Sequence, residues 1–246
     1  MDLEEKVNEL QTAYLELEKT HDMLVRHEKL AAIGEVSARI AHEIRNPLAT
    51  IGGFAKSIQK KYDDRERTIR NANIIAEEVV RLEGILTNIL DFSKPSTPKK
   101  VLLNVNTLVK ESLVFIENQV ITNNVVVSLD LADRELEAEL DASQIRQVLI
   151  NVLKNAINAM PEGGSLGITT GSSGSEVLIE VIDTGKGIPE QYLDNIFEPF
   201  FTTHGNGTGL GLSISHRIVQ NHQGRLEISS KEGEGTTVRI MLPVRT

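Results

Sequence analysis

A single histidine beside a carboxylate lies at the centre of residues 40–48, which read Ile-Ala-His-Glu-Ile-Arg-Asn-Pro-Leu. A neutral imidazole is a competent nucleophile at pH 7, and Glu43 can orient the ring of His42 or take its proton. On a helix, His42 and Asn46 share one face, a turn apart. An HExxH zinc pair is excluded, because position 46 is Asn rather than His. The segment indicates either nucleophilic chemistry at His42 or a surface histidine beside a charge.

Two asparagines lie on the flank of an apolar stripe that predicts a helix over residues 143–160. The stripe consists of Ile145, Val148, Leu149, Val152, Ala156 and Ala159. Asn151 and Asn155 are four residues apart beside it, and amide oxygens are hard ligands that suit Mg²⁺ together with phosphate oxygens. Solvated asparagines are the alternative for this pair taken alone.

An acid and two glycines follow a predicted strand at residues 183–187, Asp-Thr-Gly-Lys-Gly. Glycines let a ligand approach the backbone closely. A buried carboxylate at Asp183 can accept a hydrogen bond from the exocyclic amine of adenine, whereas guanine presents a carbonyl there. A plain β-turn is the alternative for this pattern in isolation.

Three of the six phenylalanines fall within residues 197–201, and a glycine-rich segment follows at residues 207–211, Gly-Thr-Gly-Leu-Gly. This segment leads into an apolar helix predicted from about residue 209 to 222. Free N–H groups and the positive end of the helix dipole make such an N-terminus a site for anions. A dinucleotide fingerprint would need Gly where Leu212 stands, and no GK[ST] of a Walker loop follows.

Two long amphipathic helices must position His42. The first carries His42 and an apolar stripe from Leu30 to Ile51, with Pro47 expected to kink it. After a polar turn at residues 60–64, the second carries one apolar face made of Ile69, Ala72, Ala76, Val79, Leu82, Leu86 and Ile89. Two such helices cannot bury both apolar faces against each other. We therefore expect two antiparallel hairpins to pair into a four-helix bundle, which makes the protein a homodimer.

The chain is predicted to comprise four parts. Residues 1–29 have a heptad seam that predicts a coiled-coil helix, formed by Leu3, Val7, Leu10, Tyr14, Leu17, His21 and Leu24. The hairpin occupies residues 30–93, and residues 94–99, with two prolines, are a linker. Residues 100–246 mix strand and helix patterns, which predicts a two-layer α/β sandwich.

Ten elements are expected in the sandwich, seven strands and three helices. The strands are predicted at residues 101–105, 125–131, 137–140, 165–170, 177–183, 225–229 and 236–243. The helices are predicted at residues 106–119, 143–160 and 209–222.

Composition excludes several classes of function. A net charge of −9 argues against nucleic-acid or anionic-membrane partners. The absence of cysteine excludes disulfides and thiolate metal sites and favours a reducing compartment. With no apolar run approaching the length of a membrane span, we expect no membrane contact by this chain itself. We expect a cytoplasmic protein, or the cytoplasmic portion of a larger membrane sensor.

In their order and content these motifs resemble those of the sensor histidine kinases of two-component systems. Five segments carry the resemblance to the H, N, G1, F and G2 boxes: residues 42–48, 151–155, 183–187, 197–201 and 207–211. The resemblance covers about residues 30–246, while residues 1–29 resemble only the coiled-coil linkers that precede such cores.

The resemblance implies roles in the hairpin. His42 would be the phospho-acceptor and Glu43 its general base. Asn46 would orient water when the same protein dephosphorylates its regulator.

The resemblance also implies an ATP-binding sandwich of the GHKL (Bergerat) type, the fold shared with Hsp90, MutL and gyrase B. Asn155 would hold Mg²⁺, and Asp183 would bind adenine. The full set expected at the nucleotide is Asn151, Lys154, Asn155, Asp183, Gly185, Gly187, Thr203, His204, Gly207, Thr208, Gly209, Leu210, Gly211 and Thr236. His204 departs from the family pattern, which often has Lys there, so a fixed positive charge on the phosphates is in doubt.

The expected function is ATP-dependent autophosphorylation of His42 followed by transfer to an aspartate of a response regulator receiver domain, with phosphatase activity towards that regulator. ATP and Mg²⁺ are the expected cofactors. A catalytically weak dimeric scaffold with the same fold is the alternative. A clamp of the gyrase class would lack the His42 hairpin, and a pure coiled coil would lack the glycine-rich half.

Overall fold

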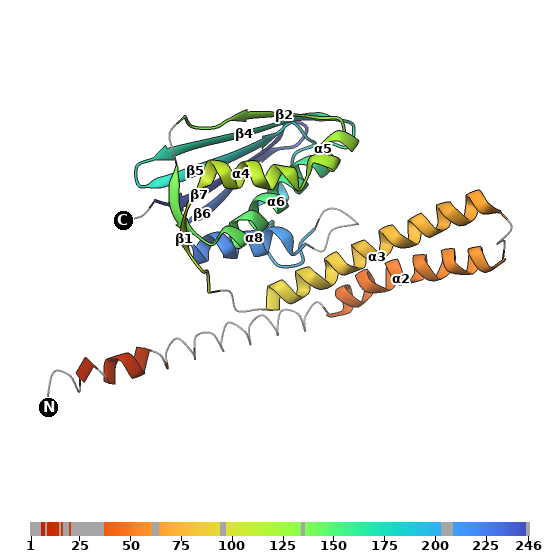
Figure 1. Ribbon diagram of the computed structural model, residues 1–246, viewed down its shortest axis with the longest axis horizontal. Coiled ribbons are helices and arrows are strands. Elements are labelled where there is room, and N and C mark those ends of the chain that lie inside the picture. Colours follow the sequence, from red (N-terminus) through yellow and green to blue (C-terminus); the bar gives the residue numbers. More distant parts are fainter. Residues whose placement is uncertain are drawn as a thin grey trace. The chain divides into compact units, whose positions relative to one another are not determined.

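The computed structural model describes residues 6–7, 9–14, 16, 20, 37–60, 64–93, 97–133, 136–202 and 209–244 (Figure 1). The chain divides into two compact units, Met1–Pro95 and Ser96–Thr246. Most of the predicted coiled coil lies outside the described residues, and those described between positions 6 and 20 are helical. No helix in the described ranges has both the length and the apolar character that crossing a bilayer requires.

The first unit contains the predicted helical hairpin, in which α2 (Ser37–Lys60) packs along α3 (Arg65–Ser93) (Figure 1). The α2 helix continues through Pro47. Asp64 caps α3, because its Oδ1 accepts a hydrogen bond from the N–H of Arg67 at 3.0 Å. Both helices that the sequence predicts around His42 are therefore present.

The hairpin buries little of its apolar surface. Among its described side chains, Pro47, Asn71 and Ile85 are buried. Asn71 donates from Nδ2 to Ser57 Oγ at 3.1 Å, so a polar contact lies between the helices. Among the described side chains of α2 and α3, the large apolar ones left exposed are Leu48, Ile69, Val79, Val80, Leu86 and Leu90. Much of the stripe predicted on the second helix thus faces away from α2.

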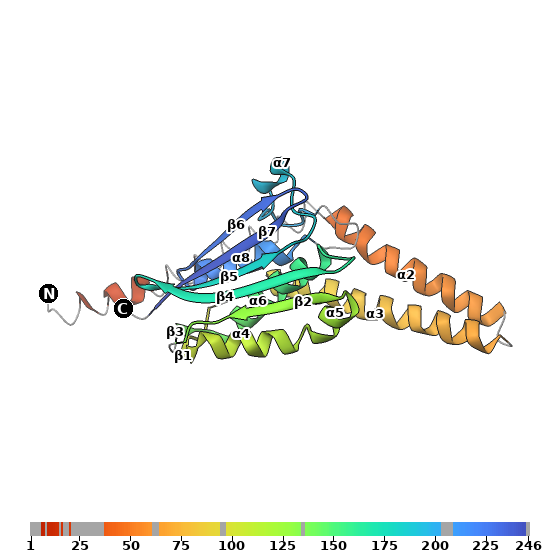
Figure 2. The same cartoon turned by 90° about the horizontal axis from the view of Figure 1, so that it is seen from above.

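The second unit is built on a five-stranded mixed sheet in the order β2-β4-β5-β7-β6, which Figure 2 shows from above. Only β2 and β4 pair in parallel, and the other neighbours are antiparallel. The strands are β2 (Val125–Asp130), β4 (Gly164–Ser173), β5 (Glu176–Asp183), β6 (Arg225–Lys231) and β7 (Gly235–Pro243). A separate two-stranded antiparallel sheet pairs β1 (Val101–Asn104) with β3 (Glu137–Leu140).

Three helices cover one face of the five-stranded sheet, which gives the predicted two-layer sandwich (Figures 1 and 2). They are α4 (Val105–Val114), α6 (Ala142–Asn158) and α8 (Gly211–Asn221). The apolar stripe of α6 is buried, with Ile145, Val148 and Leu149 among its members. The core of the unit lies between this helix layer and the sheet, where Leu166 and Ile179 are also buried.

The helix predicted over residues 106–119 is wrong in one respect, because it is broken into α4 and α5 (Glu117–Thr122). Ile116 is fully buried while the preceding Phe115 is 62% exposed. The N–H of Ile116 bonds to the carbonyl of Leu113, three residues back, which is a tighter turn than that of an α-helix. Burial of Ile116 therefore coincides with the end of α4. A short helix, α7 (Glu190–Leu193), was not predicted.

Candidate active site

A buried carboxylate ends the central strand β5. Asp183 is 5% exposed and is paired in register with Thr236 of β7. Its Oδ1 accepts a hydrogen bond from the N–H of Gly185 at 2.8 Å. Burial raises the pKa of the Asp183 carboxyl above its ordinary value, while backbone hydrogen bonds from Gly185 and Thr236 oppose that rise. The carboxylate of Asp183 is therefore a hydrogen-bond acceptor that is held in one orientation and shielded from water.

The loop that follows Asp183 is tied to two other elements. The N–H of Lys186 donates to the carbonyl of Ala159 at 3.1 Å, just beyond α6, and the carbonyl of Lys186 accepts from the N–H of Gly233 at 2.8 Å. Gly187 has φ +67°, and a Cβ there would stand 2.1 Å from the carbonyl oxygen of Lys231. Contacts within the protein therefore require glycine at position 187. Its predicted approach to a ligand stays a prediction.

The end of α6 brings two further predicted residues to this loop. Lys154 and Asn155 are both exposed on α6. Asn155 is one turn before Ala159, and its carbonyl accepts the N–H of Ala159 at 3.0 Å. Because the carbonyl of Ala159 in turn holds Lys186, Asn155 lies near the loop that follows Asp183.

Asn151 is engaged in packing between helices. Its Nδ2 donates to Ser215 Oγ on α8 at 2.9 Å. A Cβ at Gly211 would stand 2.3 Å from Oδ1 of Asn151, so glycine is needed where α8 begins. Asn151 thus fixes the distance between α6 and the start of α8, and its predicted place at the nucleotide stays a prediction.

In the described part of the chain, no side chain caps the N-terminus of α8. Leu210, the N-cap residue, is fully buried and makes no capping hydrogen bond through its side chain. The first N–H groups of a helix have no partner within the helix, and they carry the positive end of its dipole. This end of α8 is suited to bind the oxygens of an anion.

Two groups of predicted residues cannot be placed in full. The backbone of His42 and Glu43 lies in α2, but their side chains are outside the described residues. Asn46, one turn on, is exposed. Thr203, His204, Gly207 and Thr208 also lie outside the described residues.

The structure adds Ser230, which no pattern in the sequence indicated. Ser230 Oγ on β6 accepts the N–H of Ile188 at 2.8 Å and lies 2.8 Å from Thr236 Oγ1. It also donates to the carbonyl of Gly235 at 2.9 Å. Ser230 thereby connects the segment after Asp183 to β7, and an isolated serine in a strand pattern does not reveal such a role.

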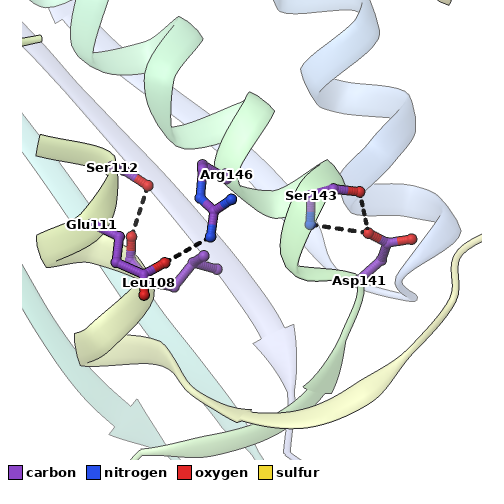
Figure 3. A network of polar contacts seen from close by, with 6 residues as sticks. All are labelled: Leu108, Glu111, Ser112, Asp141, Ser143 and Arg146. Atoms are coloured by element: carbon purple, nitrogen blue, oxygen red, sulfur yellow. Dashed lines mark hydrogen bonds and ion pairs between the residues drawn. The ribbon is translucent and has the colours of Figure 1, made fainter. Parts of the chain in front are cut away.

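The far end of α6 is fixed by polar contacts that Figure 3 shows. Asp141 caps α6 by accepting from the N–H of Ser143 at 3.0 Å and from its hydroxyl at 2.6 Å. Arg146 forms an ion pair with Glu111 of α4 at 2.6 Å. These contacts hold the helix layer in place.

Two family models match the chain. Residues 32–98 match the His Kinase A (phospho-acceptor) domain. Residues 140–246 match the histidine kinase-, DNA gyrase B-, and HSP90-like ATPase.

Named relatives and a solved structure are similar over most of the chain. The sensor histidine kinase ZraS of Escherichia coli (strain K12) is 37% identical over 223 residues, which are 91% of this chain and 48% of ZraS. Sporulation kinase C of Bacillus subtilis (strain 168) is 34% identical over 98% of this chain and 56% of its own. The chain thus spans about half the length of these curated relatives. The crystal structure of histidine kinase ThkA in complex with response regulator protein TrrA is 36% identical, with a TM-score of 0.81, over 94% of this chain and 67% of that one.

Proposed function

This chain belongs to the sensor histidine kinases, and from that premise we propose that it transfers the γ-phosphoryl group of ATP to His42 and then to an aspartate of a response regulator. The observation that carries the proposal is the buried Asp183 at the end of β5. The loop after Asp183 is tied to the end of α6 near the exposed Asn155, and no described side chain caps the start of α8. Asp183 would bind the base of Mg·ATP, Asn155 the metal ion, and the start of α8 the phosphates.

Asp183 is proposed to bind adenine. Its carboxylate accepts hydrogen bonds, and the exocyclic amine of adenine donates them, whereas guanine has a carbonyl at that position. The hydrogen bonds from Gly185 and Thr236 leave the carboxylate little freedom to turn. That restriction favours adenine over guanine. With guanine bound, the carboxylate of Asp183 would face the guanine carbonyl, and both groups are acceptors.

Asn155 is proposed to hold Mg²⁺. Mg²⁺ takes few protein ligands and completes its shell with water and phosphate oxygens, so one exposed amide oxygen fits it. In the described part of the chain, no group of three His, Cys, Asp or Glu residues offers an all-protein site. When bound, Mg²⁺ neutralises charge on the phosphates. Lys154, exposed beside Asn155, adds positive charge at the same end of α6.

His42 is proposed to be the phospho-acceptor. Its imidazole nitrogen forms the bond to phosphorus while the bond to the β-phosphate oxygen breaks, and ADP leaves. Glu43, its neighbour in sequence, would take the ring proton or hold the ring in the reactive tautomer. The contribution of the sandwich is mostly positioning and charge stabilisation, as phosphoryl transfer demands.

A homodimer is proposed to form through the hairpins. The exposed apolar side chains of α3 include Ile69, Val79 and Leu86, which lie on one face of that helix. A second copy can cover this face and form a four-helix bundle.

The regulator is proposed to dock on the unit that carries His42, and Asn46 to act in the reverse direction. The relative ThkA was solved in complex with a response regulator. Asn46 is exposed one turn beyond His42, so its amide can orient a water molecule that attacks the phosphorylated aspartate.

Incubation of the full chain with Mg²⁺ and γ-labelled ATP tests the proposal. We expect label that is lost in acid and kept in base, as a phosphoimidazole requires, and no label on His42→Gln. Acid-stable label, or label on His42→Gln, would contradict the assignment of His42. Tight ATP binding with no label on either protein would instead favour the scaffold.

A further inference from the structure

Two segments that are separated in sequence join where α8 begins. The N–H of Phe200 donates to the carbonyl of Gly209 at 3.0 Å. Gly209 has φ +65°, and a Cβ on it would stand 2.4 Å from the carbonyl carbon of Phe200. The position of Phe200 therefore determines the position of Gly209, which lies two residues before the first residue of α8.

Phe200 holds a conformation that needs support from its surroundings. It has φ +67°, although it is not a glycine, and it is 3% exposed. A bulky residue in the left-handed region persists only when neighbouring contacts impose it. Without that support Phe200 would relax and its bond to Gly209 would weaken.

Phe197, three residues before Phe200, takes part in a ring stack. The ring of Phe197 lies on the imidazole of His216, with centroids 4.5 Å apart and planes inclined by 23°. In the same segment, the ring centroids of Tyr192 and Phe201 lie 5.7 Å apart. Partial burial lowers the pKa of His216, so its ring is neutral at pH 7. His216 lies in α8, so the stack ties residues 197–201 to the helix that Gly209 leads into.

From these contacts we propose that His216 is a positioning residue for the phosphates of the nucleotide. Through Phe197, Phe200 and Gly209 its ring fixes the backbone at the N-terminus of α8, where N–H groups face the phosphate oxygens. The inference rests on the proposed nucleotide site. It assigns His216 no contact with ATP and no proton transfer.

Two variants of the full chain separate the ring from the rest of the side chain. His216→Gln removes the stack and keeps a polar side chain, whereas His216→Phe keeps an aromatic ring. We expect His216→Gln to weaken ATP binding by about two- to tenfold, the strength of an aromatic pair, and His216→Phe to remain close to the wild type. Adenosine, which has no phosphates, should bind all three proteins equally.

Calorimetric titration with ATP and with adenosine gives both affinities. Equal ATP affinity of wild type and His216→Gln would overturn the proposal. A matching loss of ATP and adenosine affinity would also overturn it, because that result indicates general damage to the site. Failure of His216→Phe to restore ATP affinity would show that the ring is not what matters.

Amide hydrogen exchange on the nucleotide-free protein distinguishes failure of this inference from failure of the proposed function. His216→Gln should speed exchange at Phe200, and His216→Phe should not. If the wild type bound no ATP, the proposed function would fall, and exchange would still show whether the stack supports Phe200. Unchanged exchange in His216→Gln would overturn the stack's role whatever the nucleotide results.

Discussion

In the sandwich, α6 alone buries seven residues, whereas the described side chains of the whole hairpin include three buried ones, Pro47, Asn71 and Ile85. The sandwich places helices over a sheet, so one chain supplies both sides of its core. The hairpin has one helix on each side of a narrow contact, and Asn71 uses part of that contact for a hydrogen bond to Ser57.

This difference in burial indicates that the two units respond differently to protein concentration. The sandwich is complete within one chain, so its nucleotide affinity should not depend on protein concentration. The hairpin leaves Ile69, Val79 and Leu86 exposed, so its stability should rise with the concentration of a second copy. The proposed chemistry needs both units, so it should depend on the concentration of a second copy, as the hairpin does.

The largest effect is expected from His42→Gln, which removes the acceptor in the hairpin and leaves the sandwich intact. Labelling from γ-labelled ATP should fall to background. ATP affinity, measured by titration, should stay within about twofold, because the two sites belong to separate units. A large loss of ATP affinity would break the comparison by showing that the sandwich relies on His42.

The next effect concerns the exposed face of α3. Val79→Glu would place a charge in the proposed dimer contact, and an uncompensated buried charge should raise the dimer dissociation constant by about 100-fold or more. Glu77→Gln, an exposed position on another face of α3, is the matched control and should leave the dimer unchanged. Sedimentation velocity measures both, and a Val79→Glu chain that remains fully dimeric would show that this face is not the contact.

Asp183→Asn should act on the sandwich alone. Loss of a charged acceptor should weaken ATP binding by about 10- to 100-fold, measured by titration. Burial raises the pKa of Asp183 in the folded state, so its favourable contribution to stability exists at low pH and is lost as pH rises through the folded pKa. At pH 7 the nucleotide-free Asn variant should therefore melt no lower than the wild type. A lower melting temperature would mean that the carboxylate is needed for the fold.

The smallest effect is a pH dependence within the sandwich. His222 is fully buried, its Nε2 accepts the N–H of Asp141 at 3.0 Å, and its Nδ1 donates to the carbonyl of Ile218 at 2.8 Å. Burial lowers the pKa of His222, so its neutral form stabilises the fold above pH 6.5, and that contribution is lost as pH falls below 6.5.

Denaturant unfolding at several pH values tests this expectation. The contribution of His222 to the free energy of unfolding should fall by at most about 1.4 kcal/mol per pH unit below 6.5, and His222→Leu should reduce the observed slope by that amount. The slope should be the same at every protein concentration, because His222 belongs to the unit that is complete in one chain. An identical slope in wild type and His222→Leu would exclude His222 as its source.

Sequence periodicity predicted the helices and strands well, because apolar spacing reports directly which face is buried. It did not distinguish the two apolar faces of α3, since burial against α2 and burial against a second copy produce the same pattern. The sequence did not indicate that Gly187 meets the backbone of Lys231. Nor did it indicate that Asn151 bonds to Ser215. Such contacts join residues far apart in sequence, and no local pattern encodes them.

The most direct test of the division between the two units is a dilution series at saturating Mg·ATP. Nucleotide occupancy per chain and the rate of phosphohistidine formation per chain are measured on the same samples, with the dimer fraction from light scattering. We predict that occupancy stays constant while the rate falls in step with the dimer fraction. A rate per chain that stays constant in fully monomeric samples would contradict the account.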